Sequence, residues 1–343
     1  MKTIKTVCFT MFIAAFISSC DSDEDNDVTT VCDAKFYTMA VDIPDSSVGV
    51  FDIFEYEKSN VLSTPMALTS GNALNNATGG PLSEMLSAIN PNTGEITYQF
   101  TYHPAIFKYN INTNTVTQST FNGGYNYEYL GNSLYSIKHT YIGSSVLSDY
   151  TIIDESGNAV GQTIQNVDIS NSGATTLLLF KSTSNNQDKL YYLANTKLLT
   201  YNKTTDTWSD DLLETYNETT NKVFYRSLEY VDDNTLYILK SDETIASSYT
   251  LELLKVDLSG SVPQVSVIKD LTNSLSLSAN TLLAPGGDRQ INAAYDACDD
   301  SFYFNYTNPF TMNSIVFEIK LISDTVNEYP VNGKYLYGLD IIN

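Results

Sequence analysis

Apolar and polar residues alternate in short strand-like runs along most of the chain, and one kind of run recurs. It ends in a tyrosine and follows a cluster of turn-forming residues, as at positions 188–189 and 233–234, which is the punctuation of a β-hairpin. The six copies are Phe36–Tyr37, Thr97–Tyr98, Leu134–Tyr135, Leu190–Tyr191, Leu236–Tyr237 and Phe302–Tyr303. Successive tyrosines lie 61, 37, 56, 46 and 66 residues apart, so the pattern predicts a repeated supersecondary unit.

Further runs surround each tyrosine. A second apolar run follows it, for example Leu198–Asn202, and five of the six copies continue through a polar turn into a third run, as at Thr204–Trp208. Another run precedes every tyrosine except the first, at 86–90, 127–130, 177–180, 228–231 and 292–295. The sequence therefore predicts four strands in five of the repeats and three strands in the first.

The strand that the first repeat lacks is found at the other end of the chain. Leu336–Ile342 has the pattern of the run that precedes a tyrosine, and no further run follows it. Joined to 32–37, it regenerates the pattern of 294–303. We therefore predict an all-β fold, a six-bladed β-propeller closed by its C-terminal strand, since closure removes exposed sheet edges. A β-sandwich and a seven-bladed propeller with one degenerate repeat stay open as alternatives.

Composition agrees with a folded acidic body. The 343 residues include 18 Lys and Arg against 40 Asp and Glu, which gives a formal charge of −22. Such a balance excludes a nucleic-acid partner bound through a basic patch. With 42% hydrophobic and 12% aromatic residues, the chain can bury a core.

The N-terminus has the pattern of an export signal. Lys2 and Lys5 precede an apolar segment, Val7–Ile17, which is too short to span a bilayer as a helix, and Cys20 follows two serines. The segment resembles a bacterial lipoprotein signal in a relaxed form. The resemblance implies a signal peptide over 1–19 and a lipid on the Cys20 thiol. An ordinary secretory peptide, in which Cys20 is incidental, is the alternative.

An acidic tether follows, over residues 20–31. Five carboxylates lie within 21–27, and such a run repels itself and stays extended. It resembles the export signal of surface lipoproteins in Bacteroidota, which implies a lipid anchor on the outer face of the outer membrane and no other membrane contact. An EF-hand is disfavoured because its sixth and twelfth positions would be Asn26 and Cys32. We expect no cofactor, and bound calcium has no support.

The predicted body, residues 32–343, resembles β-propellers in general. The stretch 201–208 is similar to a kelch repeat, but the other repeats lack its tryptophan and paired glycines. Sialidase-type Asp-boxes and WD signatures are absent from the sequence. The resemblance therefore implies a fold and no particular activity.

Two cysteines lie within this body. Cys32 and Cys298 each stand five residues before a recurring tyrosine, in blades that closure would make neighbours. Either a disulfide clamps the ring, or the two thiols are buried separately, because equivalent positions of adjacent blades can exceed the reach of a disulfide. With only two histidines in the chain, a Cys/His zinc site has too few ligands, so we expect no metal site.

Propeller geometry predicts a functional face. Loops between the second and third strands, and loops between blades, emerge together around the mouth of the axial channel, and these loops hold all the histidines and arginines. The candidate binding face consists of His103, His139, Arg226, Asp288, Arg289, Tyr102, Tyr141 and Tyr306. Aromatic rings beside polar groups suit sugars or a protein partner. Alternatively, the tyrosines pack between loops and Arg289 pairs with an acid such as Asp288.

Two functions remain open. One is non-catalytic recognition of a glycan, peptide or partner protein by a cell-surface lipoprotein. The other is a polysaccharide lyase or hydrolase with its active site at the axial mouth, where His103 or His139 would transfer protons and Arg226 or Arg289 would stabilise an anion. The sequence contains no G-x-S-x-G, H-E-x-x-H or phosphate-loop motif, so its catalytic residues are unknown and binding is favoured.

Overall fold

The computed structural model describes residues 32, 34–42, 51–57, 66–69, 85–100, 105–120, 123–142, 147–170, 181–216, 222–245, 248–283, 291–307, 313–331 and 333–342. The chain divides into two units, Met1–Val31 and Cys32–Asn343, and the described residues all belong to the second. The predicted signal peptide (1–19) and the whole predicted tether (20–31), including Cys20, lie outside them. Among the described residues, no helix has the length and apolar character needed to cross a bilayer.

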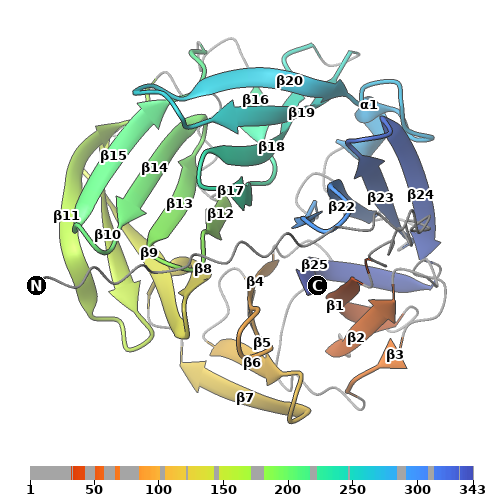
Figure 1. The fold of residues 1–343 in the computed structure, drawn as a ribbon, viewed down its shortest axis with the longest axis horizontal. Coiled ribbons are helices and arrows are strands. Elements are labelled where there is room, and N and C mark those ends of the chain that lie inside the picture. The colour runs from red at the N-terminus through yellow and green to blue at the C-terminus, as the bar shows by residue number, and fades with distance from the viewer. Residues whose placement is uncertain are drawn as a thin grey trace, which may run out of the picture. The chain divides into compact units, whose positions relative to one another are not determined.

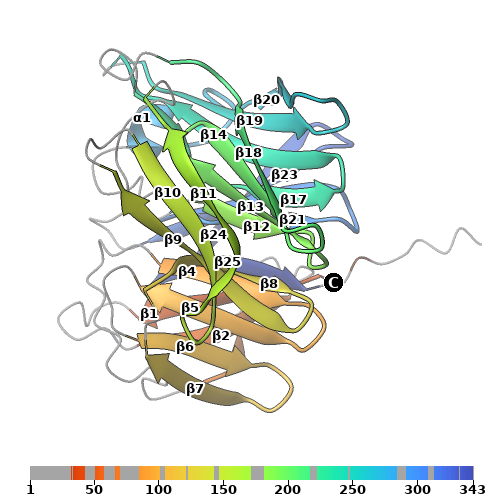
Figure 2. The ribbon, with the colours of Figure 1, turned by 90° about the vertical axis from the view of Figure 1, so that its left-hand side faces the viewer.

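Six antiparallel sheets surround a common axis as the blades of a β-propeller (Figure 1). The prediction of six blades is therefore confirmed, and the described residues form neither a sandwich nor a seventh blade. Figure 2 shows the strands of each blade from the side. One short helix, α1 (Ala279–Leu282), lies between blades 5 and 6.

The strands are numbered along the chain, and each blade is given from the axis outward. Blade 1 contains β25 (Lys334–Ile342), β1 (Lys35–Asp42), β2 (Phe51–Glu57) and β3 (Met66–Ala67). Blade 2 contains β4 (Met85–Asn90), β5 (Glu95–Phe100), β6 (Ala105–Asn110) and β7 (Thr115–Thr120). Blade 3 contains β8 (Tyr125–Leu130), β9 (Ser133–Tyr141), β10 (Leu147–Asp154) and β11 (Ala159–Asp168).

The second half of the ring has the same order. Blade 4 contains β12 (Lys181–Ser184), β13 (Lys189–Ala194), β14 (Lys197–Asn202) and β15 (Thr207–Leu212). Blade 5 contains a split inner strand, β16 (Val223–Tyr225) and β17 (Glu229–Asp232), then β18 (Thr235–Asp242), β19 (Thr250–Asp257) and β20 (Gln264–Asp270). Blade 6 contains β21 (Ala293–Asp296), β22 (Ser301–Thr307), β23 (Ser314–Lys320) and β24 (Thr325–Val331).

The ring closes as predicted. β25 pairs antiparallel with β1, with Asp340 opposite Tyr37 and Leu336 opposite Ala40. A disulfide joins Cys32, just before β1, to Cys298 in the turn between β21 and β22, with Cα atoms 5.6 Å apart. Blades 1 and 6 are thus linked both by a completed sheet and by a covalent bond.

The core lies between the blades. Buried apolar residues form six clusters, and each cluster is shared by one pair of neighbouring blades. A strand in the middle of a blade is therefore buried on both faces: all seven residues of β22 are buried, whereas the outer β20 is mostly exposed. Burial of apolar area at about 25 cal/mol per Å² is the main force that holds the blades together.

Turn residues define the outer hairpins. Asn114, Asp206 and Asp324 have positive φ of 53°, 50° and 56°, a conformation that Asn and Asp tolerate better than most residues. The Asn202 side chain accepts a hydrogen bond from the Thr205 backbone N–H at 2.9 Å, which stabilises one such turn. The polar turns read from the sequence thus have a specific geometric role.

The inner strand of blade 4 differs from its prediction. We expected it at 177–180, which lies outside the described residues, and the structure forms it from the next four, β12. Lys181, Ser182, Thr183 and Ser184 face a polar channel, so this strand lacks the apolar pattern by which the others were found.

Candidate functional site

The inner strands of all six blades place one residue at an equivalent register position, opposite the recurring tyrosine of the next strand. We call these six residues the channel ring. In blade order they are Asp340 opposite Tyr37, Ser87 opposite Tyr98, Glu128 opposite Tyr135, Thr183 opposite Tyr191, Glu229 opposite Tyr237 and Ala294 opposite Tyr303. Acidic residues alternate with small neutral residues, so the carboxyl groups come from blades 1, 3 and 5.

The three inner strands that carry these acids are also irregular. The pairing register shifts by one residue just before Glu128 and just before Asp340, and positive φ angles of 54° at Asn126 and 71° at Gly338 lie within these bulges. In blade 5 the inner strand is split, and its register shifts by one residue just before Glu229. The strands β4, β12 and β21 pair without a shift. Because a bulge re-aims the side chains next to it, the backbone itself distinguishes the acidic positions.

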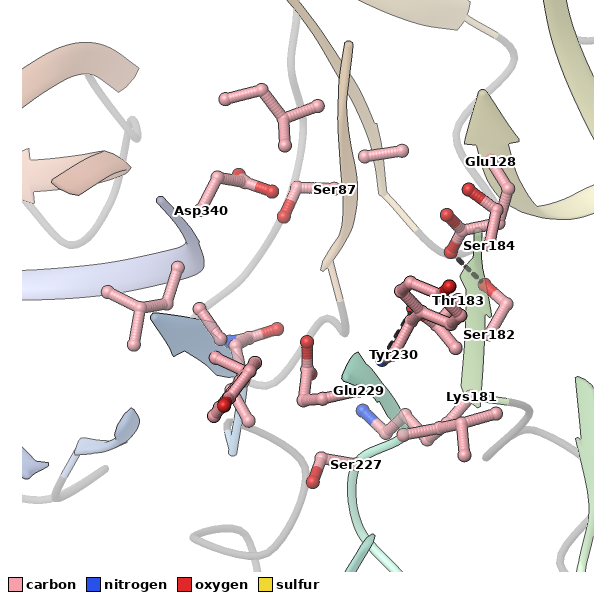
Figure 3. A pocket seen from close by; sticks show the side chains of 18 of the residues that line it. Ser87, Glu128, Lys181, Ser182, Thr183, Ser184, Ser227, Glu229, Tyr230 and Asp340 are labelled. Atoms are coloured by element: carbon pink, nitrogen blue, oxygen red, sulfur yellow. Dashed lines mark hydrogen bonds between the residues drawn. The ribbon is translucent and has the colours of Figure 1, made fainter. Parts of the chain in front are cut away.

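The channel ring borders a cavity of about 370 Å³ on the axis. Figure 3 shows Ser87, Glu128, Thr183, Glu229 and Asp340 around this open space. Its volume lies in the range of small-molecule sites, and most of the residues in its wall are polar or charged. As whole residues Glu128 and Glu229 are half-buried, and Asp340 is buried.

Burial dominates the protonation of two ring acids. It raises the pKa of Glu128 to about 8, although Ser182 Oγ donates a hydrogen bond to its Oε1 at 2.7 Å. Burial also raises the pKa of Asp340 to about 7, although the Ser87 hydroxyl lowers it by hydrogen bonding. Both groups therefore exchange protons near neutral pH.

The third acid lies beside the one lysine of the cavity wall. Burial raises the pKa of Glu229 well above its ordinary range, and the charges of Glu128 and Asp340 raise it further. Lys181 lowers it, and the Lys181 amino group also donates to the Ile291 carbonyl at 3.4 Å. Three carboxyl groups and one amino group thus interact across the cavity.

Asp340 contains an unsatisfied atom. The residue is 7% exposed, and its Oδ2 has no hydrogen-bond partner within the described part of the chain. Burying a carboxylate oxygen without a partner costs free energy, which is why such atoms are rare in folded proteins. Here the atom belongs to a residue that lines the cavity, where a ligand can satisfy it.

The ring acids do not form a metal cage. Among the described residues, no three His, Cys, Asp or Glu side chains are placed to hold one metal ion. Calcium requires six to eight oxygen ligands at about 2.3–2.6 Å from one centre. Figure 3 shows the side chains of Glu128, Glu229 and Asp340 on different sides of the cavity.

Several predicted site residues lie outside the described residues. They are Cys20, Tyr102, His103, Asp288 and Arg289. The structure therefore neither brings them to one face nor separates them.

His139 lies in an aromatic cluster of blade 3. We expected it in a loop, but β9 extends through it to Tyr141. Its ring lies 4.9 Å from Tyr141, 5.9 Å from Tyr125 and 6.4 Å from Tyr150, measured between centroids. Burial lowers the pKa of His139, and the residue is not part of the cavity wall. Of these rings, Tyr141 is the exposed one, at 41%.

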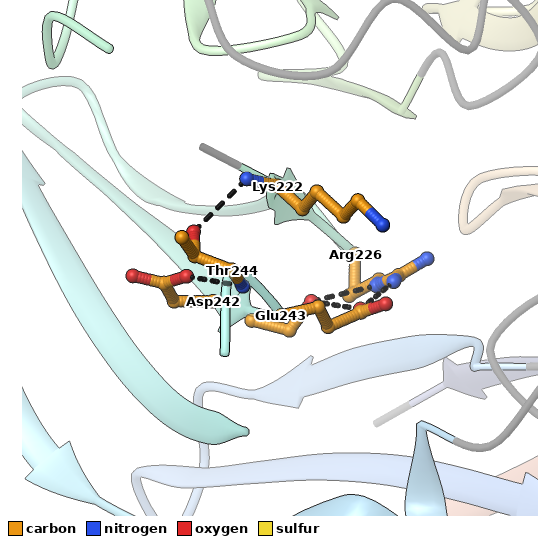
Figure 4. Close-up of polar contacts among 6 residues, drawn as sticks. Lys222, Arg226, Asp242, Glu243 and Thr244 are labelled. Atoms are coloured by element: carbon orange, nitrogen blue, oxygen red, sulfur yellow. Dashed lines mark hydrogen bonds and ion pairs between the residues drawn. The ribbon is translucent and has the colours of Figure 1, made fainter. Parts of the chain in front are cut away.

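Arg226 lines the cavity but is held by its own blade. It forms an ion pair with Glu243 (Figure 4) and donates from Nε to Ser241 Oγ at 3.0 Å. Its guanidinium group also stacks over the Phe224 ring, 4.3 Å from the centroid. Only 1% of the residue is exposed. Arg226 therefore supports the split inner strand of blade 5, and its charge is balanced by Glu243.

Tyr306 is not an exposed platform as expected. It lies within β22, is 3% exposed, and its hydroxyl donates to the Thr281 carbonyl at 3.3 Å. Its position on a strand that is buried along its whole length explains why it packs in the core.

Sequence reasoning missed the channel ring. The inner strands were recognised, but their acids were not compared, because each acid lies at a different distance from its tyrosine. Glu128 precedes Tyr135 by seven residues and Glu229 precedes Tyr237 by eight, whereas Asp340 lies near the other end of the chain from Tyr37. Aligning the repeats through antiparallel register, instead of along the chain, would have revealed the alternation.

No protein-family model and no curated protein matches this sequence. Solved structures are similar in fold. TolB from Acinetobacter baumannii matches with a TM-score of 0.52 and 10% identity over 90% of this chain and 66% of the TolB chain. A chain of the nidogen/laminin complex matches with a TM-score of 0.49 and 12% identity over 90% of this chain and 98% of that chain. At these identities the likeness shows the fold alone, a β-propeller.

Proposed function

We propose that the protein is a lipid-anchored binding protein of the cell surface, and that its propeller holds a ligand in the axial cavity. The observation that carries the proposal is the channel ring around this cavity, with the unsatisfied Oδ2 of Asp340 in its wall. The ligand is a glycan, a peptide or a segment of a partner protein, of which one polar group enters the cavity. The cavity of about 370 Å³ has room for such a group.

The anchor rests on sequence signals. Cys20 would carry the lipid, and the acidic run at 21–27 would follow it as an extended tether. We expect mass spectrometry of the protein from its native membrane to find a diacylglyceryl-modified N-terminal Cys20. A Cys20→Ser variant should lose both this mass and the membrane association. An unmodified Cys20 in the mature protein would contradict the anchor.

Binding in the cavity is tested with a variant that fills it. Ser87→Phe adds an aromatic side chain to the channel ring and leaves all three acids in place. We would probe glycan and peptide arrays with the purified full-length protein and with this variant, whose folding is checked by circular dichroism. Ligands bound by the wild type and lost by Ser87→Phe support the proposal. Ligands that bind both proteins equally would place the binding surface elsewhere.

A second candidate function is acid–base catalysis in the same cavity. It is favoured by the pKa values of Glu128 and Asp340, about 8 and 7, which suit proton transfer near neutral pH. Any ligand found on the arrays should be incubated with wild type and with Glu128→Gln. Turnover of the ligand by the wild type that is lost in Glu128→Gln would show that the protein is an enzyme. A ligand that the wild type leaves unchanged would support binding without catalysis.

A further inference from the structure

The cavity wall has an excess of negative charge. The ring contributes three carboxyl groups, and Lys181 balances one of them. Arg226 also borders the cavity, but its charge is matched by Glu243 in their ion pair. When all three ring acids are ionised, two of their negative charges therefore have no positive charge in the cavity wall to balance them.

The arrangement of the three acids indicates what shape a cation must have to contact all of them. Equivalent register positions in a repeated fold lie at a similar level along the axis, and the acids alternate with neutral residues around it. Carboxyl groups thus approach from three directions. Since no three acidic side chains of the described residues converge on one metal position, a bare ion cannot contact all of them.

A guanidinium group has the matching properties. It is planar, its charge is delocalised over three nitrogens, and its N–H donors point outward in several directions at once. It is also more weakly hydrated than an ammonium ion, so it enters a half-buried site at lower cost. The buried Oδ2 of Asp340, which has no partner in the described part of the chain, provides one acceptor for it.

We propose that the axial cavity binds a guanidinium group between Glu128, Glu229 and Asp340, carried by a small molecule or by an arginine side chain of a peptide. This inference rests on the proposed binding function and names the chemistry of its ligand. The neutral ring residues Ser87, Thr183 and Ala294 leave room beside the acids for the rest of the ligand.

Proton linkage follows from the same groups. Before the cation arrives, burial favours the protonated carboxyl groups, with pKa values of about 8 for Glu128 and about 7 for Asp340. The other groups that affect the three acids are Lys181, Ser87 and Ser182. A bound guanidinium stabilises the ionised forms, so binding releases protons and strengthens as pH rises from 5.5 to 8.5.

The experiment is calorimetric titration of the full-length protein at pH 8.5 with methylguanidinium, agmatine and an arginine-containing tetrapeptide. The two small ligands and the peptide distinguish the two sources of the group. We expect one site, an affinity at least tenfold lower at pH 5.5, and an enthalpy that depends on the ionisation heat of the buffer. Asp340→Asn and Glu229→Gln should each weaken binding at least tenfold.

The controls separate this inference from the proposed function. Asp211→Asn, in the outer strand β15, changes the net charge of the protein equally and should bind like wild type. Equal weakening by Asp211→Asn would indicate a general charge effect and overturn the inference. So would tighter binding of methylammonium, calcium or magnesium than of methylguanidinium. If no guanidinium compound binds while Ser87→Phe still abolishes another ligand, the inference fails and the proposed function stands.

Discussion

Glu318 and Asp340 are both buried carboxylic acids, but the two regions that contain them treat the carboxyl group in opposite ways. Glu318 lies at the seam, the contact between blades 6 and 1, and accepts hydrogen bonds from Tyr303, Tyr329 and Asn327. Burial raises its pKa, but these three hydrogen bonds, together with the charge of Lys320, lower the pKa below its ordinary value. Asp340 lies in the axial channel, where burial raises its pKa to about 7 and Oδ2 has no partner among the described residues.

The difference separates structural groups from groups available to a ligand. At the seam the disulfide Cys32–Cys298 and the edge-to-face contact of Phe36 with Tyr303, at 4.7 Å, accompany a fully satisfied carboxylate. In the channel the buried acids have fewer hydrogen-bond partners than Glu318 has. Their burial therefore lowers the stability of the free protein, and a bound ligand restores this stability. We therefore expect mutations to have opposite effects on stability in the two regions.

The largest effect is expected from breaking the covalent link of the seam. The bond closes a loop with a sequence separation of 266 residues, so a Cys32→Ser, Cys298→Ser double variant should lose about 3–5 kcal/mol of unfolding free energy. Urea denaturation followed by circular dichroism measures the loss. Reduction of the wild type with dithiothreitol should match the variant, and a stability that reduction leaves unchanged would contradict a clamping role.

The next effect is expected at Glu318. Glu318→Leu keeps a similar volume but leaves the hydroxyl groups of Tyr303 and Tyr329 and the Asn327 amide without their acceptor. We expect a loss of about 2–4 kcal/mol in the same assay, because buried donors without partners cost free energy. Asp211→Asn, on an outer strand, serves as the control and should change stability by less than about 0.5 kcal/mol.

The pH dependence of wild-type stability should show both regions. Folding raises the pKa values of Asp340 and Glu128 from near 4 in the unfolded chain to about 7 and about 8. Their contribution to stability is therefore complete below pH 4 and is lost as pH rises through about 7 and 8. Glu318, with a lowered pKa, contributes above its unfolded value and loses its contribution as pH falls further. We expect stability to decline steadily between pH 5 and 8, measured by urea denaturation at each pH. A stability that does not change over this pH range would contradict the raised pKa values of the ring acids.

The smallest effect, that of Asp340→Asn, has the opposite sign, because this variant should increase stability. Asp340→Asn removes a charge that the folded protein disfavours above pH 7, so at pH 8 it should stabilise the protein by about 1–2 kcal/mol. At pH 4, where Asp340 is already protonated in the folded state, the variant should match the wild type. Thermal unfolding at both pH values measures the difference, and destabilisation at pH 8 would show that Asp340 is structural.

Local patterns predicted much of the fold. The tyrosine runs and the clusters of turn residues identified six blades because hairpins and strand alternation are properties of short segments. The inner strand of blade 4 was not recognised at Lys181–Ser184, since these residues are polar and line the channel. Tyr306 was placed on a loop because its strand, β22, continues farther than the turn pattern indicates.

The channel ring could not be read in the same way. Its acids look like isolated polar residues within apolar strands, and the hairpins that separate them from the tyrosines differ in length. Arg226 was expected at the axial mouth on a loop, whereas its pairing with Glu243 and its stacking on Phe224 depend on the split inner strand. His139 was expected in a loop because the sequence does not show how far β9 extends. Its extension depends on pairing with β10, where His139 lies opposite Tyr150.

The amino-acid sequence by itself determined the number of blades and the strand that closes them, because alternation and turn chemistry act over a few residues. It also holds the signals on which the lipid anchor is proposed. Tertiary structure alone decided which side chains meet at the axis. Residues as distant as Ser87, Glu128 and Asp340 become neighbours there through cross-strand register, bulges and ring closure, and these depend on contacts between segments that are far apart in the chain.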